Sequence, residues 1–341
     1  MKIWASLPEE GSLQNMAYLA QRAEELGFDG VSTPENRHDP FFPLLLAAEH
    51  TQNLLIGTSV AIAFPRSPMI TANIAWDLQA FSKGRFVLGL GTQVKGHNIR
   101  RFSVPWVAPG PRLREYVQSL RAIWDCWQNG TPLSYAGRHY HFTLMTPMFN
   151  PGPIQHPVIP VQIAAVNPYM CRLAGEMCDG ILLHSLCTTR YIREIVQPAL
   201  TEGALRAGRS LGEVEVDGGG FVISGADAEE VARNREVARK RMAFYASTRT
   251  YKPAMDLHGW SDTAVKLHEM SLRGLWDDMT HEITDEMVAE FAAVGTYEEI
   301  PEKLAARYSG TPVSRLHIGV PLARTDLTER LQAMVAAIKS L

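Results

Sequence analysis

The stretch DLQAFSKGRFVLGLGTQ, residues 77–93, decides the fold of this chain. Its first half predicts a helix that ends at Gly84, because the residue after a helix C-terminus often has positive φ, which glycine adopts without steric cost. The FVLGLG segment that follows is apolar on both faces, which is typical of a parallel strand covered by helices. Gly89 and Gly91 leave the backbone bare at the carboxyl end of this strand, a pattern that fits either a tight turn or a close approach by a ligand.

Strand and helix patterns alternate along the whole chain. The segments between the predicted strands, and the segment after the last one, carry apolar residues at helical spacing, as in residues 112–128 and 326–341. Because such alternation indicates parallel strands joined by right-handed crossovers, we predict a (β/α)8 TIM barrel of the α/β class. The eight predicted strands are residues 3–7, 28–33, 54–63, 85–90, 161–166, 180–184, 214–224 and 315–320.

Two long segments interrupt this alternation, and we expect them to be insertions after the fourth and seventh strands. Residues 92–111 predict a long polar loop, and residues 247–301 contain short helical pieces that end in a helix-start signature, VGTYEE. Residues 135–142 predict a small hairpin. Since α/β barrels reach 341 residues as one unit, residues 1–341 are expected to form a single TIM-barrel domain, with residues 247–301 as a helical insertion before the last strand.

The composition is that of an ordinary soluble protein. The formal net charge is −3 and 20% of the residues are charged, so we expect no nucleic-acid partner, because phosphate binding needs clustered lysine and arginine. No apolar run reaches the roughly 20 residues of a membrane span, and the first residues, MKIWAS, predict a strand rather than a secretory signal. A cytoplasmic protein without a metal is expected, because no zinc spacing is formed by Cys126, Cys171, Cys178 and Cys187.

The functional residues of a TIM barrel lie in the loops at the carboxyl ends of its strands. Polar residues at these ends are therefore the candidates, although an ordinary loop hydrogen bond explains any one of them equally well. They are Glu35, Asn36 and His38 after the second strand, Ser59 in the third, Thr92, Gln93, Lys95 and His97 after the fourth, residues 166–170 after the fifth, and His184 after the sixth.

The start of the fifth helix is a candidate phosphate site. Asn167 and Pro168 directly follow the fifth strand, so several free N–H groups and the positive end of the helix dipole are expected to point into the barrel mouth. No lysine ends a strand where a Schiff base would form, and no pair of histidines with a carboxylate is placed for a metal. Because these side chains alone support little chemistry, we expect an organic cofactor that carries a phosphate.

Six segments carry a family resemblance: GFDGVSTPEN (27–36), GTSVAIAFPRSP (57–68), SKGRFVLGLGTQ (82–93), LREYVQSLRAIW (113–124), AAVNPYMCRLAGEMCDG (164–180) and, nearer the C-terminus, VGTYEEIPEKL. With them the chain resembles the luciferase-like monooxygenase superfamily. Within it, the chain resembles the coenzyme F420-dependent oxidoreductases related to methylenetetrahydromethanopterin reductase. No single segment is specific, but together they span over half the chain in the family's order.

The resemblance implies a bound flavin or deazaflavin, which is coenzyme F420 or alternatively FMN, across the carboxyl-end mouth of the barrel. A cis peptide bond between Ser59 and Val60 would lie behind its ring, and residues 165–170 would hold its phosphate through backbone N–H groups. Thr92 and Gln93 would line its side chain. The implied cofactor-binding residues are Ser59, Val60, Ala61, Gly91, Thr92, Gln93, Ala165, Val166, Asn167, Pro168, Tyr169 and Met170.

The chain departs from the family at two positions where relatives carry an acid or base. Several F420 enzymes have a histidine where this chain has Asn36 and a glutamate near Val94, so that pair of groups is not transferred. The catalytic candidates that remain are Glu35, Asn36, His97 and His184.

The resemblance also implies where the rest of the ligands would bind. The acidic tail of F420 would meet Lys95, Arg100 and Arg101. Residues 94–109 and the aromatic insertion near residues 251–276 would build the substrate side, and the aromatic residues suggest a mainly apolar substrate.

We therefore expect an F420-dependent oxidoreductase that transfers a hydride between the deazaflavin and a mainly apolar organic substrate. Two alternatives stay open: a two-component monooxygenase that uses reduced FMN and O2, and a flavin-binding barrel without catalysis. The expected partners are a small-molecule substrate, a separate F420 or flavin reductase, and a second copy of the chain in a homodimer formed through the second and third helices.

Overall fold

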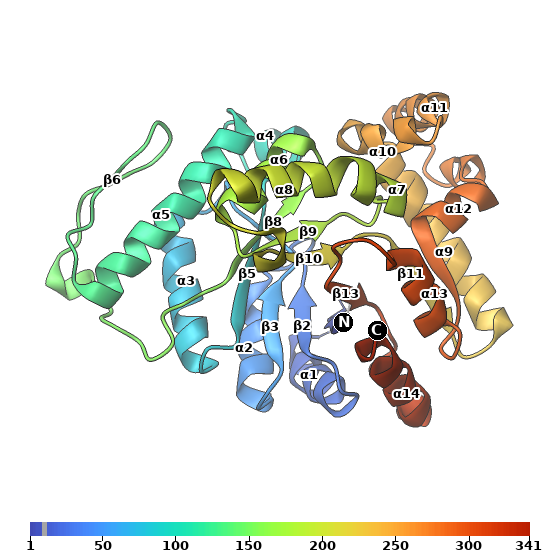
Figure 1. Cartoon of the computed structure of the whole chain (residues 1–341), viewed down its shortest axis with the longest axis horizontal. Coiled ribbons are helices and arrows are strands. Elements are labelled where there is room, and N and C mark those ends of the chain that lie inside the picture. Colours follow the sequence, from blue (N-terminus) through green and yellow to red (C-terminus); the bar gives the residue numbers. More distant parts are fainter. Residues whose placement is uncertain (9–11) are drawn as a thin grey trace.

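The computed structural model describes residues 1–8 and 12–341, and within them one parallel sheet closes on itself as a barrel (Figure 1). The short strand β4 (Ala61–Ile62) continues β3 after an interruption, so eight strands circle the barrel in the part of the chain described. The predicted (β/α)8 TIM barrel is confirmed. In order around the barrel the strands are β1 (Lys2–Ser6), β2 (Gly30–Thr33), β3 (Leu55–Thr58), β5 (Phe86–Gly91), β8 (Val161–Ala165), β9 (Gly180–Leu183), β10 (Glu215–Gly218) and β13 (Arg315–Ile318).

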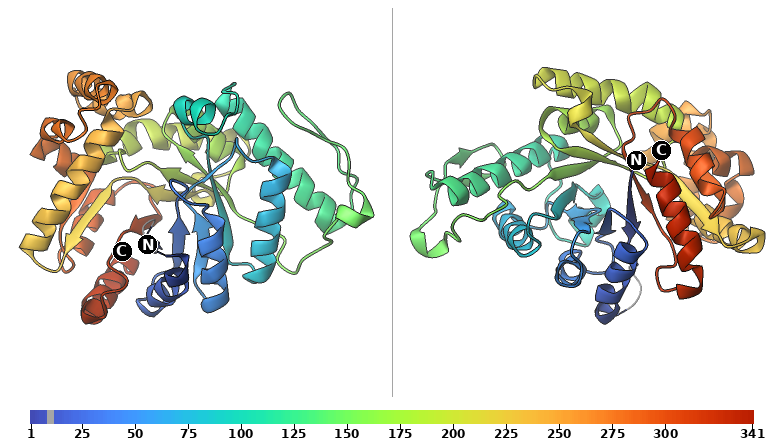
Figure 2. Two further views of the ribbon diagram at one scale, coloured as in Figure 1. Left: turned by 180° about the vertical axis from the view of Figure 1, so that it is seen from behind. Right: turned by 60° about the horizontal axis from the view of Figure 1, so that its bottom comes forward.

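Helices cover the outside of this barrel (Figures 1 and 2). Buried aromatic side chains of α5 pack inward, and the ring of Trp127 meets that of Trp76 on α3 edge-on at 5.6 Å. The covering helices are α1 (Met16–Glu25), α2 (Phe41–His50), α3 (Pro68–Phe81), α5 (Pro109–Asn129), α6 (Pro168–Met177), α7 (Thr189–Tyr191) with the π-helical turn Ile192–Val196 and α8 (Gln197–Arg206), α13 (Ile300–Tyr308) and α14 (Thr328–Lys339).

The prediction of one continuous seventh strand over residues 214–224 is wrong in one respect, because this segment forms two strands. After β10 the chain turns at Gly220, where φ is +105°, and continues as β11 (Phe221–Gly225). β11 leaves the barrel and pairs in parallel with β12 (Ala292–Thr296). The predicted helix start at VGTYEE is therefore partly a strand, since pairing with β11 outweighs the local pattern and α13 begins only at Ile300.

The predicted loop of residues 92–111 is also wrong in part, because it contains the short helix α4 (Lys95–Arg100). Val94 precedes this helix and caps it with no side-chain hydrogen bond, so the usual N-cap signal is missing from the sequence. The predicted hairpin is confirmed as β6 (Tyr135–Ala136) and β7 (His141–Phe142), which pair antiparallel.

The segment between β11 and α13 forms a second hydrophobic core beside the barrel. Met242, Met255 and Leu267 are fully buried in it. Figure 1 shows α10 and α11 at the end of the barrel toward which the arrows of β2 and β3 point, so this second core adjoins the carboxyl-end mouth. Its helices are α9 (Ala228–Ala246), α10 (Lys252–Leu257), α11 (Ser261–Leu272) and α12 (Asp285–Phe291).

A network of charged side chains fills part of the barrel interior. Arg315 of β13 is 1% exposed and donates to Asp217 at 2.8 Å, to Glu215 at 2.7 Å and to Gln162 at 2.5 Å. Burial alone would raise the pKa of Asp217, but the charges of His317 and Arg315 and their hydrogen bonds lower it below its ordinary value. The Asp217 carboxylate is therefore ionised inside the barrel, where it depends on these partners.

We expect Arg315→Leu to lower the free energy of unfolding by about 3–5 kcal/mol, because it leaves the buried carboxylate of Asp217 and the partly buried carboxylate of Glu215 without their shared partner. Urea unfolding at pH 7 measures the loss. Arg190→Leu is the control, because the ion pair of Arg190 with Glu194 is exposed and its loss should change stability little. A loss from Arg315→Leu no larger than the control's would show that the network does not stabilise the fold.

Candidate active site

The third barrel strand breaks at the mouth, between β3 and β4. The Ser59–Val60 peptide bond in this break is cis, as the family resemblance implied. Beside the break, Thr58 Oγ1 donates to the carbonyl oxygen of Gly89 at 2.6 Å and accepts from the Gly89 N–H at 3.0 Å. Thr58 therefore fastens the broken strand to β5.

β5 lies so close to the broken strand that two of its positions need glycine. A Cβ on Gly89 would lie 1.9 Å from the carbonyl oxygen of Thr58, and a Cβ on Gly91 would lie 2.5 Å from Cγ2 of Val60. Both distances are too short for any side chain. The space beside these glycines, for which the sequence suggested a turn or a ligand, is filled by the third strand.

Three segments of the predicted cofactor site meet at this edge of the sheet. β4, β5 and β8 are neighbours, with Ala61 opposite Leu90 and Leu90 opposite Ile163. Because parallel strands end at the same edge, the residues that follow them lie side by side. We call these segments the rim, and they are residues 59–61, 91–93 and 165–170.

α6 begins directly at the rim. Asn167 is its N-cap, and Asn167 Oδ1 accepts from the Met170 N–H at 3.0 Å. Pro168 has no N–H, which leaves Tyr169 as the residue of this first turn whose N–H has no hydrogen bond to the described residues. The expectation of several free N–H groups is therefore too broad, because proline lacks one and the Asn167 cap occupies another.

Glu35, a candidate acid or base, is engaged in an ion pair. Its Oε2 accepts from Arg66 at 2.6 Å and from the N–H of Ile62 in β4 at 2.6 Å. Arg66 also pairs with Asp39 at 2.8 Å, and the Glu35 side chain is only 9% exposed. Glu35 therefore holds the loop after β2 against the continuation of the broken strand.

α4 carries one further candidate, His97, and ends beside another, Asn36. Arg101, which follows α4, donates to the carbonyl oxygen of Asn36 in the loop after β2. Partial burial lowers the pKa of His97, and the charges of Arg101 and Arg100 lower it further, so the His97 ring is mostly neutral near pH 7. Asn36, His97 and His38 are all exposed.

Asn98, which the sequence analysis did not select, fixes the loop that leaves β5. Its side chain is fully buried, and Nδ2 donates to the carbonyl oxygens of Thr92 at 2.9 Å and Val94 at 3.2 Å. Gln93 has φ of +55°, and its Oε1 accepts from the Val94 N–H at 2.9 Å. The rim residues Thr92 and Gln93 are therefore held in place by this amide and by local hydrogen bonds.

His184 directly follows β9 and is covered by aromatic rings of the second core. Its ring stacks on Tyr251 at 3.8 Å and meets Tyr245 edge-on at 4.6 Å. Its Nδ1 accepts from the Leu186 N–H at 3.0 Å, so the neutral ring carries its proton on Nε2. Burial lowers the pKa of His184 to about 3. His184 is therefore a neutral hydrogen-bond donor at pH 7.

The floor of the mouth holds a second histidine that the sequence analysis did not select. The ring of His317 in β13 meets Trp4 edge-on at 5.6 Å, and its Nδ1 lies 2.5 Å from Asp217 Oδ2. Charged and apolar residues alternate in the EVDG of β10 and the RLHI of β13. Since alternate residues of a strand point to the same face, this period of two was the signal that placed Asp217, Arg315 and His317 inside the barrel.

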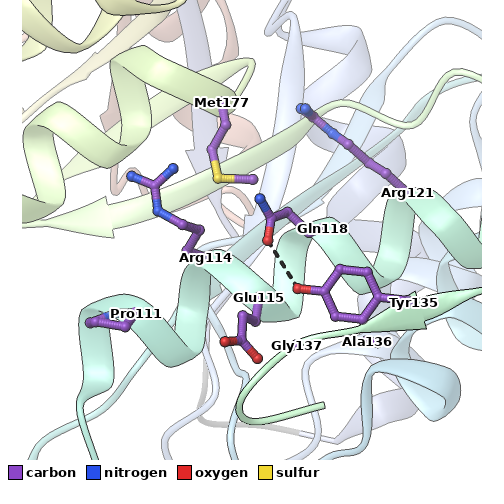
Figure 3. Close-up of a pocket in the computed structure, with 9 residues that line it drawn as sticks. All are labelled: Pro111, Arg114, Glu115, Gln118, Arg121, Tyr135, Ala136, Gly137 and Met177. Atoms are coloured by element: carbon purple, nitrogen blue, oxygen red, sulfur yellow. Dashed lines mark hydrogen bonds between the residues drawn. The ribbon is translucent and has the colours of Figure 1, made fainter. Parts of the chain in front are cut away.

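A separate cavity of about 680 Å³ lies outside the barrel, between α5 and the β6–β7 hairpin (Figure 3). Within it, Glu115 accepts from the backbone N–H groups of residues 138–140 at 2.6–3.2 Å, and Gln118 accepts from the Tyr135 hydroxyl at 2.9 Å. Met177 lines it at the end of α6 that is remote from the rim. These polar groups are paired with each other, and their hydrogen bonds anchor the hairpin to α5.

The described residues hold no group of histidine, cysteine and carboxylate side chains suited to a metal ion. Cys126, Cys171, Cys178 and Cys187 are free and buried. Over the same residues, no helix has both the length and the apolar character needed to cross a membrane.

The sequence model of the luciferase-like monooxygenase family matches residues 1–315 of this chain. The chain belongs to the luciferase-like monooxygenase family. Membership of this family confirms the resemblance that the six sequence segments carried.

Several known proteins are similar to this chain over nearly its whole length. An uncharacterised protein of Mycobacterium tuberculosis is 46% identical over 97% of both chains. The 5,10-methylenetetrahydromethanopterin reductase of Archaeoglobus fulgidus is 26% identical over 94% of both chains. The solved structure of the coenzyme F420-dependent tetrahydromethanopterin reductase from Methanopyrus kandleri has a TM-score of 0.80 at 21% identity, over 99% of this chain and 98% of that one, and so shares its fold.

We expect the free energy of unfolding to fall as the pH is lowered from 7 to 5, and His184→Phe to reduce that fall. The folded pKa of about 3 lies below the ordinary 6.5, so the unfolded chain binds the proton first and is favoured below pH 6.5. The slope from this group is at most about 1.4 kcal/mol per pH unit. Urea unfolding at several pH values measures it, with His141→Gln, an exposed hairpin residue, as the control. Equal slopes for all three proteins would refute the assignment.

Proposed function

We propose that this protein is an F420-dependent oxidoreductase that transfers a hydride between the deazaflavin and a mainly apolar organic substrate. The observation that carries this proposal is the rim, which consists of main chain and uncharged side chains at the ends of three neighbouring strands. A rim of this kind suits an uncharged planar ring with a phosphate beside it. When bound, F420 would supply the ring carbon that gives or takes the hydride.

The residues of the rim fit the parts of such a cofactor. The positive end of α6 and the unbonded N–H of Tyr169 would hold the phosphate. The broken strand at Ser59 and Val60 would back the ring. Positive charge for an acidic tail would come from α4 and the residue after it, namely from Lys95, Arg100 and Arg101.

Aromatic side chains of the second core support an apolar substrate. Tyr245 and Tyr251 cover His184 beside the mouth. Such rings bind apolar molecules through their faces, and the Nε2–H of His184 adds one polar contact that would orient the substrate.

A two-component FMN monooxygenase is the second candidate. The uncharged rim suits a flavin ring as well as a deazaflavin ring, and the family is described by its monooxygenases. The chemistry separates the two candidates, because a deazaflavin has carbon in place of the flavin N5 and does not readily activate oxygen.

Either activity would use a small-molecule substrate and a separate F420 or flavin reductase.

We also propose a homodimer. Its support is the set of large apolar side chains that α2 and α3 expose, which are Phe42, Leu45, Ile70 and Phe81.

Anaerobic titrations with F420 and with FMN test the proposal. We expect saturable F420 binding that is at least about tenfold tighter than FMN binding, equivalent to about 1.4 kcal/mol, and no oxygen uptake when reduced F420 is mixed with the protein in air. Tight FMN binding with oxygen uptake would favour the monooxygenase. Binding without oxidation or reduction of the cofactor by a panel of enones, quinones and alcohols would favour the barrel without catalysis.

We expect Asn167→Asp to weaken F420 binding by at least about tenfold, because it places a negative charge beside the phosphate. Aspartate caps a helix as well as asparagine does, so the stability of the variant should not change. Asn167→Ser is the matched control, since serine keeps the cap and adds no charge. Unchanged F420 affinity in Asn167→Asp would remove the start of α6 from the cofactor site.

A further inference from the structure

Two buried polar atoms at the floor of the mouth have no hydrogen-bond partner among the described residues. They are Nε2 of His317 and Nε1 of Trp4, whose rings contact each other. A buried polar atom without a partner costs about 1–3 kcal/mol, so a pair of them in one place calls for a physical reason.

The neighbours of His317 fix its tautomer. Nδ1 of His317 lies 2.5 Å from Oδ2 of Asp217. Because Asp217 is ionised and its oxygens can only accept a hydrogen bond, Nδ1 must carry the proton of this contact. In the neutral ring, Nε2 is then a lone pair that can accept a proton. This is the opposite tautomer to that of His184, whose Nε2 is already protonated.

The charges around His317 balance without it. Asp217 of β10 and Arg315 of β13 form one pair, and Glu215 of β10 with Lys2 of β1, which lie 2.7 Å apart, form a second beyond Arg315. Two carboxylates and two cations are thus paired with one another, and Nε2 of His317 is the ring nitrogen that contacts none of them.

His317 reaches the mouth from below. Its side chain is 17% exposed, whereas Arg315, which closes the barrel beneath it, is 2% exposed. The exposed part of the ring therefore faces the mouth. Nε2 itself is covered in the free chain, so contact with a bound molecule would require side chains around it to shift.

We propose that His317 is the acid–base residue of this site, exchanging a proton with the bound ligand through Nε2, and that Asp217 is its positioning residue. The proposal rests on the proposed oxidoreductase function and adds the proton to the hydride. The other candidates are less suited to this role: Glu35 is ion-paired with Arg66, and His184 already carries its proton on Nε2.

The proton step completes the hydride transfer as follows. When bound, the reduced cofactor would supply the hydride to one carbon of a polarised double bond, whose π electron pair would move to the other atom of that bond. That atom would take the proton of the Nε2–H bond of His317, whose electron pair would stay on nitrogen, and the ring would regain a proton from solvent once the ligand has left. In the reverse direction, neutral Nε2 would take the hydroxyl proton while the hydride of the substrate carbon would pass to the oxidised cofactor. Asp217 stays ionised and keeps the Nδ1 proton in place.

Histidine NMR tests this proposal without a known substrate. The full chain is labelled with ¹⁵N-histidine, and long-range ¹H–¹⁵N spectra are recorded before and after saturation with F420, or with FMN if that is the cofactor bound. His317→Gln assigns the His317 signals, and His141→Gln provides a control assignment in the exposed hairpin. We expect His317 to be protonated at Nδ1 in the free protein and its Nε2 signal to move on saturation, while the His141 signals stay in place.

Asp217→Asn adds a test of the positioning role. It should release the Nδ1 proton and shift the His317 ring toward the Nε2–H tautomer, and should leave His141 unchanged. If His317→Gln does not fold, the signals that move in Asp217→Asn identify His317, and if Asp217→Asn does not fold, the wild-type spectra assigned with His317→Gln remain decisive.

The outcomes separate the two proposals. Saturable cofactor binding with an unmoved His317 Nε2 signal, or a free protein with His317 unprotonated at Nδ1, would overturn the role of His317 and leave the proposed function standing. Binding of neither F420 nor FMN in the titration would overturn the proposed function and, with it, the role of His317.

Discussion

The close approach of β5 to the broken third strand is the contact on which the rest of the mouth depends. The carbonyl oxygen of Thr58 occupies the position that a side chain on Gly89 would need, and Val60 does the same at Gly91. Thr58 also exchanges two hydrogen bonds with Gly89. Because Gly89 and Gly91 bring only main chain to this contact, the edge that they share with β8 presents peptide groups and small uncharged side chains. The proposed use of this edge to grip an uncharged ring follows from that packing.

The barrel interior is polar where most barrels of this kind are filled by branched apolar side chains. Arg315 binds two carboxylates and an amide in a space that excludes water, and such a cluster is tolerated only when every charge has its partner. One consequence concerns histidine. The Asp217 carboxylate accepts a hydrogen bond from Nδ1 of His317, so that this nitrogen carries a proton. The Leu186 N–H donates to Nδ1 of His184, so that this nitrogen carries a lone pair. Two imidazoles, one directly after β9 and one in β13, thus use Nδ1 in opposite senses: it accepts a hydrogen bond in His184 and donates one to Asp217 in His317.

The second core decides what stands beside the mouth. After β10 the chain leaves the barrel, pairs as β11 with β12 and sends α9–α12 to the carboxyl end, where Tyr245 and Tyr251 enclose His184. The barrel itself does not need this excursion to close, since β10 pairs directly with β13. The apolar wall can therefore change its side chains without disturbing the rim, which separates the surface proposed for the substrate from the one proposed for the cofactor.

The sequence by itself determined the elements whose signal is local. The alternation of apolar strands and amphipathic helices gave the barrel, Gly84 marked a helix end, and Asn167 before Pro168 marked the start of α6 with its cap. The tertiary structure alone decided the features that rest on distant partners. β12 became a strand only through β11, about 70 residues earlier. The ionised Asp217 is stable only because Arg315 and His317 come from β13, which lies about 100 residues further along the chain. A local sequence pattern reflects only the conformation that a segment favours by itself in water. A buried charge, or a strand without a strong local pattern, is stable only where a distant part of the chain provides the hydrogen bonds that water would otherwise provide.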